Sequence, residues 1–80
     1  MSVTDKVKAL LAIKNRKNSE LANYLKLTPQ SLQNKLSRGS FSAEDLIKIA
    51  DFLNCSLEFN LGEGQKIKLD ISDIRQKKEE

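Results

Sequence analysis

The sequence predicts a mainly α-helical fold, in which four short helices are followed by a C-terminal β-hairpin. Two observations predict it: apolar residues recur at helical spacing up to Asn54, and from Leu57 onward they alternate with polar residues. The length of 80 residues allows one small domain, and no stretch rich in Gly, Ser or Pro divides it. We therefore expect residues 1–55 to form the helical part, residues 56–71 a hairpin packed on it or extending it, and residues 72–80 a polar tail that frays.

The helices are expected at roughly residues 4–15, 18–26, 29–38 and 42–54, where apolar residues recur three and four positions apart. Asn18 and Thr28 can cap the second and third helices, and Gly39 suits the left-handed position after the third. Ser42 and Asp45 form a capping-box pair at the fourth. The residues expected to face inward are Val7, Leu10, Leu11, Leu21, Ala22, Leu25, Leu32, Leu36, Leu46, Ile49, Ala50 and Leu53.

The hairpin is predicted from two segments, 57–61 and 67–71, in which every second residue is apolar. Gly62, Glu63 and Gly64 between them suit a three-residue loop. That loop pairs Leu61 with Gln65, Phe59 with Ile67, Leu57 with Leu69, and Glu58 with Lys68. A slip of one residue would place apolar side chains opposite polar ones, so the alternation predicts this register.

The charge distribution suggests a polyanion as a partner. Lys and Arg outnumber Asp and Glu by 14 to 11, which gives a modest net charge of +3. Residues 14–17 and 27–40, however, contain basic residues and no acid, whereas most acidic residues come later in the chain. A positive sector beside a roughly balanced remainder is typical of a nucleic-acid-binding domain.

The residue types argue against catalysis and metal binding. The chain has no histidine and a single cysteine, Cys55, so it has no His base, no metal-ligand cluster and no intramolecular disulfide. We expect no enzyme activity, no cofactor and no small-molecule ligand, with Cys55 as a half-buried structural residue. No apolar run approaches the roughly 20 residues of a membrane span. The single thiol favours a reducing compartment, so a cytoplasmic location is expected.

The helix expected at 29–38 has an unusual outer face. If Leu32 and Leu36 point inward, a rotation of about 100° per residue turns a row of uncharged polar side chains outward. These residues are Gln30, Asn34 and Ser37; Arg38 is turned outward with them, and Gln33 and Ser31 lie at the flanks. An amide side chain has a donor and an acceptor in one plane and can bond both N6 and N7 of adenine. A solvated helix that merely contains several amides would give the same pattern, so this face alone leaves both interpretations open.

The segment NSELANYLKLTPQSLQNKLSRG, residues 18–39, resembles the helix-turn-helix of the lambda-repressor and Cro type, the XRE family. The matching features are Leu21-Ala22, Leu27-Thr28, Leu32 and Arg38-Gly39, followed by Ile49-Ala50 and Leu53 in the next helix. The resemblance covers about residues 7–57. It implies a repressor-like helix-turn-helix domain and sequence-specific binding of double-stranded DNA by a transcriptional regulator, a repressor, with residues 29–38 in the major groove.

Three positions depart from the family pattern. Lys26 stands in the turn where the family usually has glycine, and a left-handed lysine costs up to about 1–2 kcal/mol. Leu36 follows Leu32 by four residues where the family more often has three. Asn18 stands where a glutamine commonly contacts phosphate. The hairpin lies outside the shared region, so the resemblance implies nothing about its role.

The expected DNA contacts follow from this division between amides and charges. Amides discriminate base edges, whereas a positive charge attracts any phosphate. The expected base contacts are Gln30, Gln33, Asn34 and Ser37. The expected phosphate contacts are Arg16, Lys17, Asn18, Ser19, Thr28, Ser31, Lys35, Arg38 and Ser40.

We also expect a homodimer, because one recognition helix contacts only a few base pairs and two half-sites increase specificity. The hairpin is the expected interface, since both of its outer edges have unpaired backbone groups; it could instead simply cover the core of a monomer. The alternative hypothesis for the function is that the chain is an antitoxin-like or other protein-interaction helix-turn-helix module with little DNA binding of its own.

Overall fold

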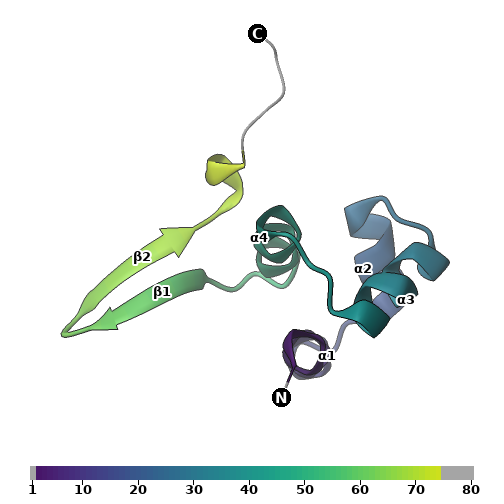
Figure 1. The fold of residues 1–80 in the computed structure, drawn as a ribbon, viewed down its shortest axis with the longest axis horizontal. Helices are drawn as coiled ribbons and strands as arrows, with labels where there is room; N and C mark the ends of the chain where they lie inside the picture. The colour runs from purple at the N-terminus through teal and green to yellow at the C-terminus, as the bar shows by residue number, and fades with distance from the viewer. Residues whose placement is uncertain (1, 75–80) are drawn as a thin grey trace, which may run out of the picture. The chain divides into compact units, whose positions relative to one another are not determined.

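The computed structural model describes residues 2–74 (Figure 1). The chain forms two compact units, Met1–Ser42 and Ala43–Glu80. The first unit contains α1 (Val3–Ile13), α2 (Asn18–Leu25) and α3 (Pro29–Arg38). The second contains α4 (Ala43–Phe52), β1 (Leu57–Gly62), β2 (Gln65–Leu69) and a short 3₁₀ helix, η1 (Ile71–Asp73). The expected fold class, four helices and a hairpin, is confirmed. Residues 75–80 of the expected polar tail lie outside the described residues.

The core of the first unit is built from all three of its helices. Its buried apolar residues are Val7, Leu11, Leu21, Ala22, Leu32 and Leu36. Leu21 and Leu32 are 0% and 1% exposed, and complete burial of such a side chain contributes about 1.5–3 kcal/mol. The expectation for Leu10 is wrong, because its side chain is 36% exposed on the edge of the α1 stripe. The inward face of α3 is the predicted one.

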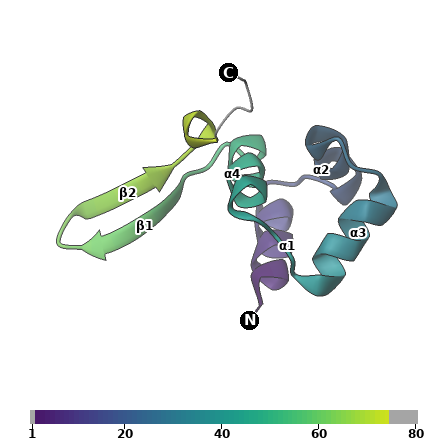
Figure 2. The ribbon, with the colours of Figure 1, turned by 45° about the horizontal axis from the view of Figure 1, so that its top comes forward.

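The connection between α2 and α3 is a tight turn at Lys26 (Figure 2). Lys26 adopts the left-handed conformation, with φ 59° and ψ 40°, and Leu27 N–H donates to the Ala22 carbonyl over 2.9 Å. The lysine therefore has the backbone conformation for which glycine is the usual choice. This turn joins α2 and α3 in a helix-turn-helix, in which the two helices pack against each other.

The helix ends confirm two predicted caps and correct a third. Thr28 caps α3, its hydroxyl accepting the Ser31 N–H over 3.1 Å, and Gly39 ends it in the left-handed conformation with φ 65°. Asn18, however, is the first residue of α2, not its cap. The cap is Lys17, because the Glu20 carboxylate accepts the Lys17 N–H over 2.9 Å and fixes the helix start one residue earlier.

In the second unit, the buried residues of α4 are Ile47, Ile49, Ala50 and, just after it, Leu53. The sequence pattern placed Leu46 on this face and omitted Ile47. Leu46 is only half-buried and lines a hollow of about 290 Å³ together with hairpin residues, including Leu57 and Leu69. Cys55 is exposed, contrary to the expected half-buried position.

The hairpin has the predicted register over most of its length. Leu57 lies opposite Leu69, Glu58 opposite Lys68, and Phe59 opposite Ile67. The predicted pair of Leu61 with Gln65 is wrong, because Gly62 is the partner of Gln65 and the ladder shifts between Asn60 and Gly62.

The cause of this shift is a two-residue turn. Glu63 and Gly64 both have positive φ, 52° and 78°, which is the signature of the type I′ turns that connect hairpin strands. Leu61 is then the extra residue of a bulge, and the Asn60 side chain accepts the Gly62 N–H over 2.9 Å.

The second strand also ends earlier than predicted. β2 stops at Leu69, so the expected strand position of Ile71 is wrong. The Asp70 carboxylate accepts the backbone N–H of Ser72 over 3.0 Å and starts η1 in place of a further strand residue. A side chain that bonds to the backbone two residues ahead competes with the sheet ladder, and here it ends the strand.

Candidate nucleic-acid interface

α3 presents one continuous uncharged polar face. Gln30, Gln33, Asn34 and Ser37 are all exposed. At about 100° per residue they fall within an arc of roughly 100°, in which Asn34 is directly opposite the buried Leu32 and Leu36 and Gln33 is at the edge nearest to them. The four predicted base-contacting residues therefore share the outer face of one helix. Their amides and hydroxyl can donate to and accept from base edges, as major-groove recognition requires.

The start of α3 has two hydroxyl groups, Thr28 and Ser31, that bond to each other. The Thr28 hydroxyl donates to the Ser31 hydroxyl oxygen over 3.0 Å while it accepts the Ser31 N–H. Both residues are exposed. Because the Ser31 hydroxyl oxygen accepts from Thr28, its own hydrogen can be donated to an external acceptor such as a phosphate oxygen.

The basic residues of α3 have different surroundings. Arg38 is exposed in the last turn of the helix, and Ser40 is exposed just after it. Lys35 is half-buried, because its position on the helix is closer to the buried leucines than to the amide face. Arg38 and Ser40 thus lie where a DNA backbone could be contacted, whereas Lys35 could reach it only with the end of its side chain.

The start of α2 contains an acidic residue for which no role was expected. One oxygen of the Glu20 carboxylate accepts from the Lys17 N–H at 2.9 Å and from the Arg16 Nε at 3.1 Å. The backbone hydrogen bond from Lys17, and then the bond from Arg16, hold the pKa of Glu20 below its usual range. The spacing of three residues from Lys17 and four from Arg16 is the sequence pattern that could have identified this cap.

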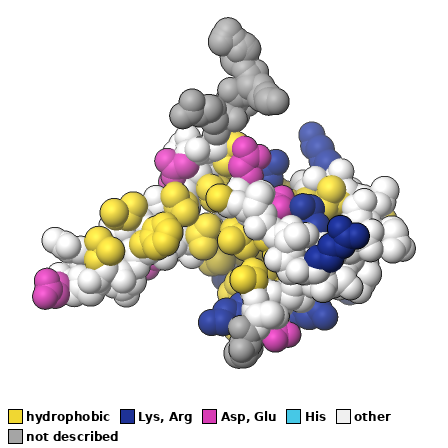
Figure 3. Space-filling model, viewed as in Figure 1, with side chains coloured by type: hydrophobic (Ala, Val, Ile, Leu, Met, Phe, Trp, Pro, Cys, Tyr) yellow, Lys and Arg dark blue, Asp and Glu magenta, His cyan; other side chains and the backbone are white. Residues whose placement is uncertain are grey.

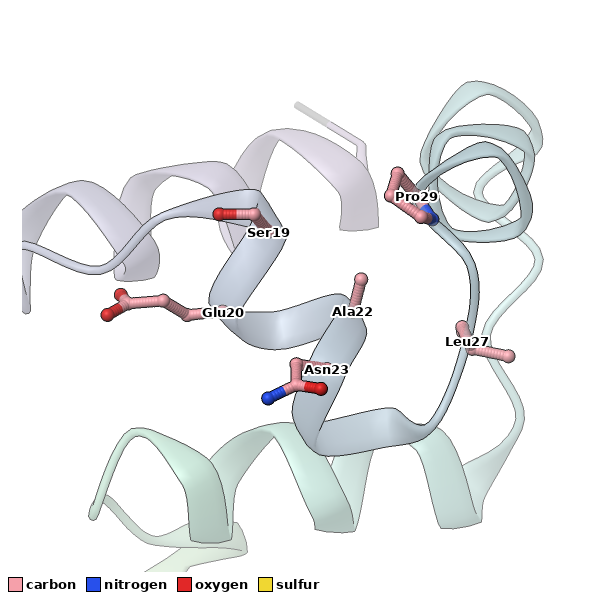
Figure 4. A pocket seen from close by; sticks show the side chains of 6 residues that line it. All are labelled: Ser19, Glu20, Ala22, Asn23, Leu27 and Pro29. Carbon is pink, nitrogen blue, oxygen red and sulfur yellow. The ribbon is translucent and has the colours of Figure 1, made fainter.

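This arrangement limits what the α2 N-terminus can offer to an anion. Glu20 occupies the Lys17 N–H and pairs with Arg16, two groups expected at phosphates. Asn18 and Ser19 are exposed, and their backbone N–H groups belong to the first turn, where no intrahelical acceptor exists. Beside them is a groove of about 380 Å³ between α2 and the start of α3 (Figure 4). It is lined by Ser19, Glu20, Ala22, Asn23, Leu27 and Pro29.

Thr4 of α1 holds the other end of α3 and was also not expected in this role. Its half-buried hydroxyl donates to the Leu36 carbonyl over 2.6 Å. A Cβ placed on Gly39 would lie 3.5 Å from the same hydroxyl oxygen, so the end of α3 is close to Thr4. No local pattern identifies such a contact, because 32 residues separate the two partners.

The two units differ in charge. Residues 1–42 contain eight Lys and Arg and two Asp and Glu, a net charge of +6, whereas residues 43–80 contain six and nine, a net charge of −3. Lys and Arg side chains gather over the part of the molecule that contains α3 (Figure 3). The net positive charge therefore belongs to the unit that contains the amide face.

Other kinds of site are not found in the part of the chain that the structure describes. Residues 2–74 contain no group of three or more His, Cys, Asp or Glu side chains arranged to hold a metal ion. The helices within the same range are too short and too polar to cross a membrane.

Comparison with known families agrees with the geometry of α2 and α3. The family model described as bacteriophage CI repressor helix-turn-helix domain matches residues 3–66. Neither a curated protein nor a solved structure matches the chain. The matched residues include α1 to α4, β1 and the first residues of β2.

Proposed function

The chain belongs to the bacteriophage CI repressor helix-turn-helix domain family, a family of DNA-binding transcriptional regulators and not an enzyme class, and we propose that it is a sequence-specific repressor. In this proposal α3 enters the major groove of double-stranded DNA. The observation that carries the proposal is the exposed, uncharged amide face of α3, which lies opposite the buried Leu32 and Leu36. A cytoplasmic location is part of the proposal, since a repressor acts where its DNA is.

Base recognition is assigned to four residues on that face: Gln30, Gln33, Asn34 and Ser37. A glutamine or asparagine amide can bond N6 and N7 of an adenine with both of its polar atoms, which discriminates adenine from the other bases by about 1–3 kcal/mol. Lysine or glutamate in these positions would have the charge but not the paired donor and acceptor. The amides therefore supply specificity.

Phosphate contacts are assigned around that face. The residues are Arg16, Lys17, Asn18, Ser19, Thr28, Ser31, Lys35, Arg38 and Ser40, as expected from the sequence. The positive charge of the first unit, +6, would supply affinity that does not depend on sequence. The Arg16–Glu20 pair weakens one of these contacts, because part of the Arg16 charge is neutralised before DNA arrives.

A homodimer is the assembly that this function favours. A single α3 of ten residues contacts few base pairs, and a second copy on an adjacent half-site multiplies the discrimination. Two-fold symmetry would then require a palindromic operator or a closely related pair of half-sites.

Duplex binding is tested with fragments selected from random double-stranded DNA, followed by fluorescence anisotropy over a range of salt concentrations. If about five phosphates are neutralised, log K falls against log salt with a slope of about −4 to −5. No retention of any duplex at low salt would contradict DNA binding. It would favour the protein-interaction module instead.

Specificity is tested with alanine variants on the selected fragment and on a random duplex. Gln30→Ala and Asn34→Ala should each weaken binding of the selected fragment by about 1–3 kcal/mol and relax the preference at particular base pairs. Arg38→Ala should weaken both duplexes alike. Gln65→Ala, which removes an exposed amide of β2, is the matched control and should change neither. Equal losses on both duplexes for all three α3 variants would contradict the proposed division between base and phosphate contacts.

A further inference from the structure

The hairpin exposes apolar side chains that no described residue of its own unit covers. Phe59 is 61% exposed and its cross-strand partner Ile67 is 57% exposed, while Leu61 in the bulge is 59% exposed. Hydrophobic side chains gather along one face of the hairpin (Figure 3). Two-stranded sheets are marginal in water without a covering layer, so these residues suggest a partner surface.

The strand edges show which side of the hairpin suits a partner. Among residues 2–74 the sheet has two strands, so β1 and β2 each have one outer edge without a neighbouring strand. β2 contains Lys66 and Lys68, and antiparallel pairing of β2 with its own copy centred anywhere from 66 to 68 places lysine opposite lysine. Like charges directly opposite each other are unfavourable, and edge lysines commonly block such pairing.

The edge of β1 has no such conflict. We propose that β1 pairs antiparallel with β1 of a second copy, with the two-fold axis at Phe59, so that two hairpins form one four-stranded sheet. In this register Phe59 lies opposite Phe59 of the second copy, and Glu58 lies opposite Asn60 of the second copy. The apolar faces of both hairpins then share one side of the sheet.

Neighbouring registers are less favourable. A centre at Glu58 would place two carboxylates directly opposite each other. A centre at Asn60 would extend the pairing to Gly62, whose φ of 83° is outside the extended region that a ladder requires. The register centred at Phe59 uses residues 57–61 and avoids both problems.

The same register brings an exposed side chain to an apolar hollow. Leu61 of the second copy lies opposite Leu57, which lines the hollow of about 290 Å³ beside α4. The other lining residues are Ala43, Leu46, Glu58, Phe59 and Leu69. The two-fold axis makes the contact reciprocal, so each copy offers both a Leu61 and a hollow.

This interface specifies how the proposed homodimer forms, and it therefore rests on that part of the proposed function. It does not depend on DNA binding, because association is measured on the free protein. A chain that dimerises through β1 but binds no duplex would support the interface and contradict the repressor. A chain that binds duplex as a monomer would support DNA binding and contradict the interface.

Association is measured by sedimentation of the full chain from micromolar to hundreds of micromolar. We expect a monomer–dimer equilibrium that Phe59→Glu weakens at least about 100-fold, because two central aromatic side chains are lost and two charges meet on the axis. Ile13→Glu is the matched control: Ile13 of α1 is even more exposed, at 77%, and its replacement should leave the equilibrium unchanged. Circular dichroism checks that both variants are folded.

The edge is identified by disulfide trapping in a Cys55→Ser background. Phe59→Cys should cross-link two copies, because residues directly opposite each other on the axis have Cα atoms about 4.5–5.5 Å apart. Ile67→Cys should not, because three strand spacings of about 4.8 Å would separate the two copies of that residue. Cross-linking of the Ile67 variant without the Phe59 variant would overturn the proposal and assign the interface to β2.

The register is tested with Asn60→Asp, which keeps an acceptor for the Gly62 N–H and lies opposite Lys66 in its own hairpin. In the proposed dimer the new carboxylate of each copy lies opposite Glu58 of the other copy, so two pairs of like charges form. This should weaken association about 3- to 30-fold at low salt and less at high salt. The double change of Asn60→Asp with Glu58→Gln should restore it. A monomer at every concentration, or a dimer insensitive to both Phe59→Glu and Asn60→Asp, would overturn the proposed interface.

Discussion

The first unit and the hairpin differ in how completely they bury their apolar residues. In the first unit six apolar residues from three helices cover one another, and the outer face of α3 is left with amides. In the hairpin no residue of β1 or β2 is fully buried, and Phe59 and Ile67 expose more than half of their side chains. The two units also differ in net charge, which is +6 for residues 1–42 and −3 for residues 43–80, the unit that contains the hairpin. A face that remains polar after folding suits a polar partner such as DNA, whereas a face that remains apolar suits protein.

The largest effect is expected when one buried and one exposed apolar residue are each replaced by alanine. Leu32→Ala should lower the free energy of unfolding by about 2–5 kcal/mol, because it leaves a cavity beneath α3. Phe59→Ala should cost at most about 1 kcal/mol when measured in dilute, monomeric protein, since it removes mainly a cross-strand contact. Urea unfolding gives both values. A similar loss for the two variants would mean that the hairpin face is packed in the monomer.

The next effect concerns the hydrogen bond that ties α1 to the end of α3. Thr4→Val keeps the shape of the side chain but leaves the Leu36 carbonyl without its hydroxyl donor, which should cost about 1 kcal/mol. Thr4→Ser retains the donor and is the control. Urea unfolding gives the stabilities, and hydrogen exchange at Gly39 tests whether the end of α3 loosens. Equal stability of the Val and Ser variants would show that this bond adds nothing.

A smaller effect is expected at the turn between α2 and α3. Lys26→Gly should raise the free energy of unfolding by up to about 1 kcal/mol, because glycine adopts the left-handed conformation without the Cβ penalty. Lys14→Gly is the matched control, since Lys14 ends α1 in the right-handed conformation and gains nothing from glycine. Thermal melts compare the two. Destabilisation by Lys26→Gly would indicate that the lysine side chain supports the turn.

The smallest effect is the pH dependence of the Glu20 cap. Because the folded pKa of Glu20 is lowered, its stabilisation is fully present above the ordinary glutamate range and is lost as the pH falls through the folded pKa. Glu20→Gln should therefore flatten the acidic part of the stability profile, while Glu63→Gln in the hairpin turn serves as the control. The same variant should steepen the salt slope of DNA binding by about 0.9, because Arg16 is released from its pair. An unchanged acidic profile would mean that the cap does not couple to folding.

The sequence by itself determined the features that depend on neighbours along the chain. The period of 3.6 placed Leu32 and Leu36 opposite the α3 amides, and the period of two paired Phe59 with Ile67. Thr28 and Gly39 marked the ends of α3 for the same reason, since a cap acts within one turn. The matched family, whose pattern is largely local, was recognisable from these residues.

Only the tertiary structure decided which of two similar apolar residues is buried and where long-range contacts form. Periodicity could not choose between Leu46 and Ile47, because that depends on what covers each side of α4. The Thr4 contact with Leu36 joins residues 32 positions apart, and no local pattern encodes it. The two-residue turn at Glu63 was missed because glutamate is not a residue that favours positive φ, and the geometry of the closed ladder imposes that conformation.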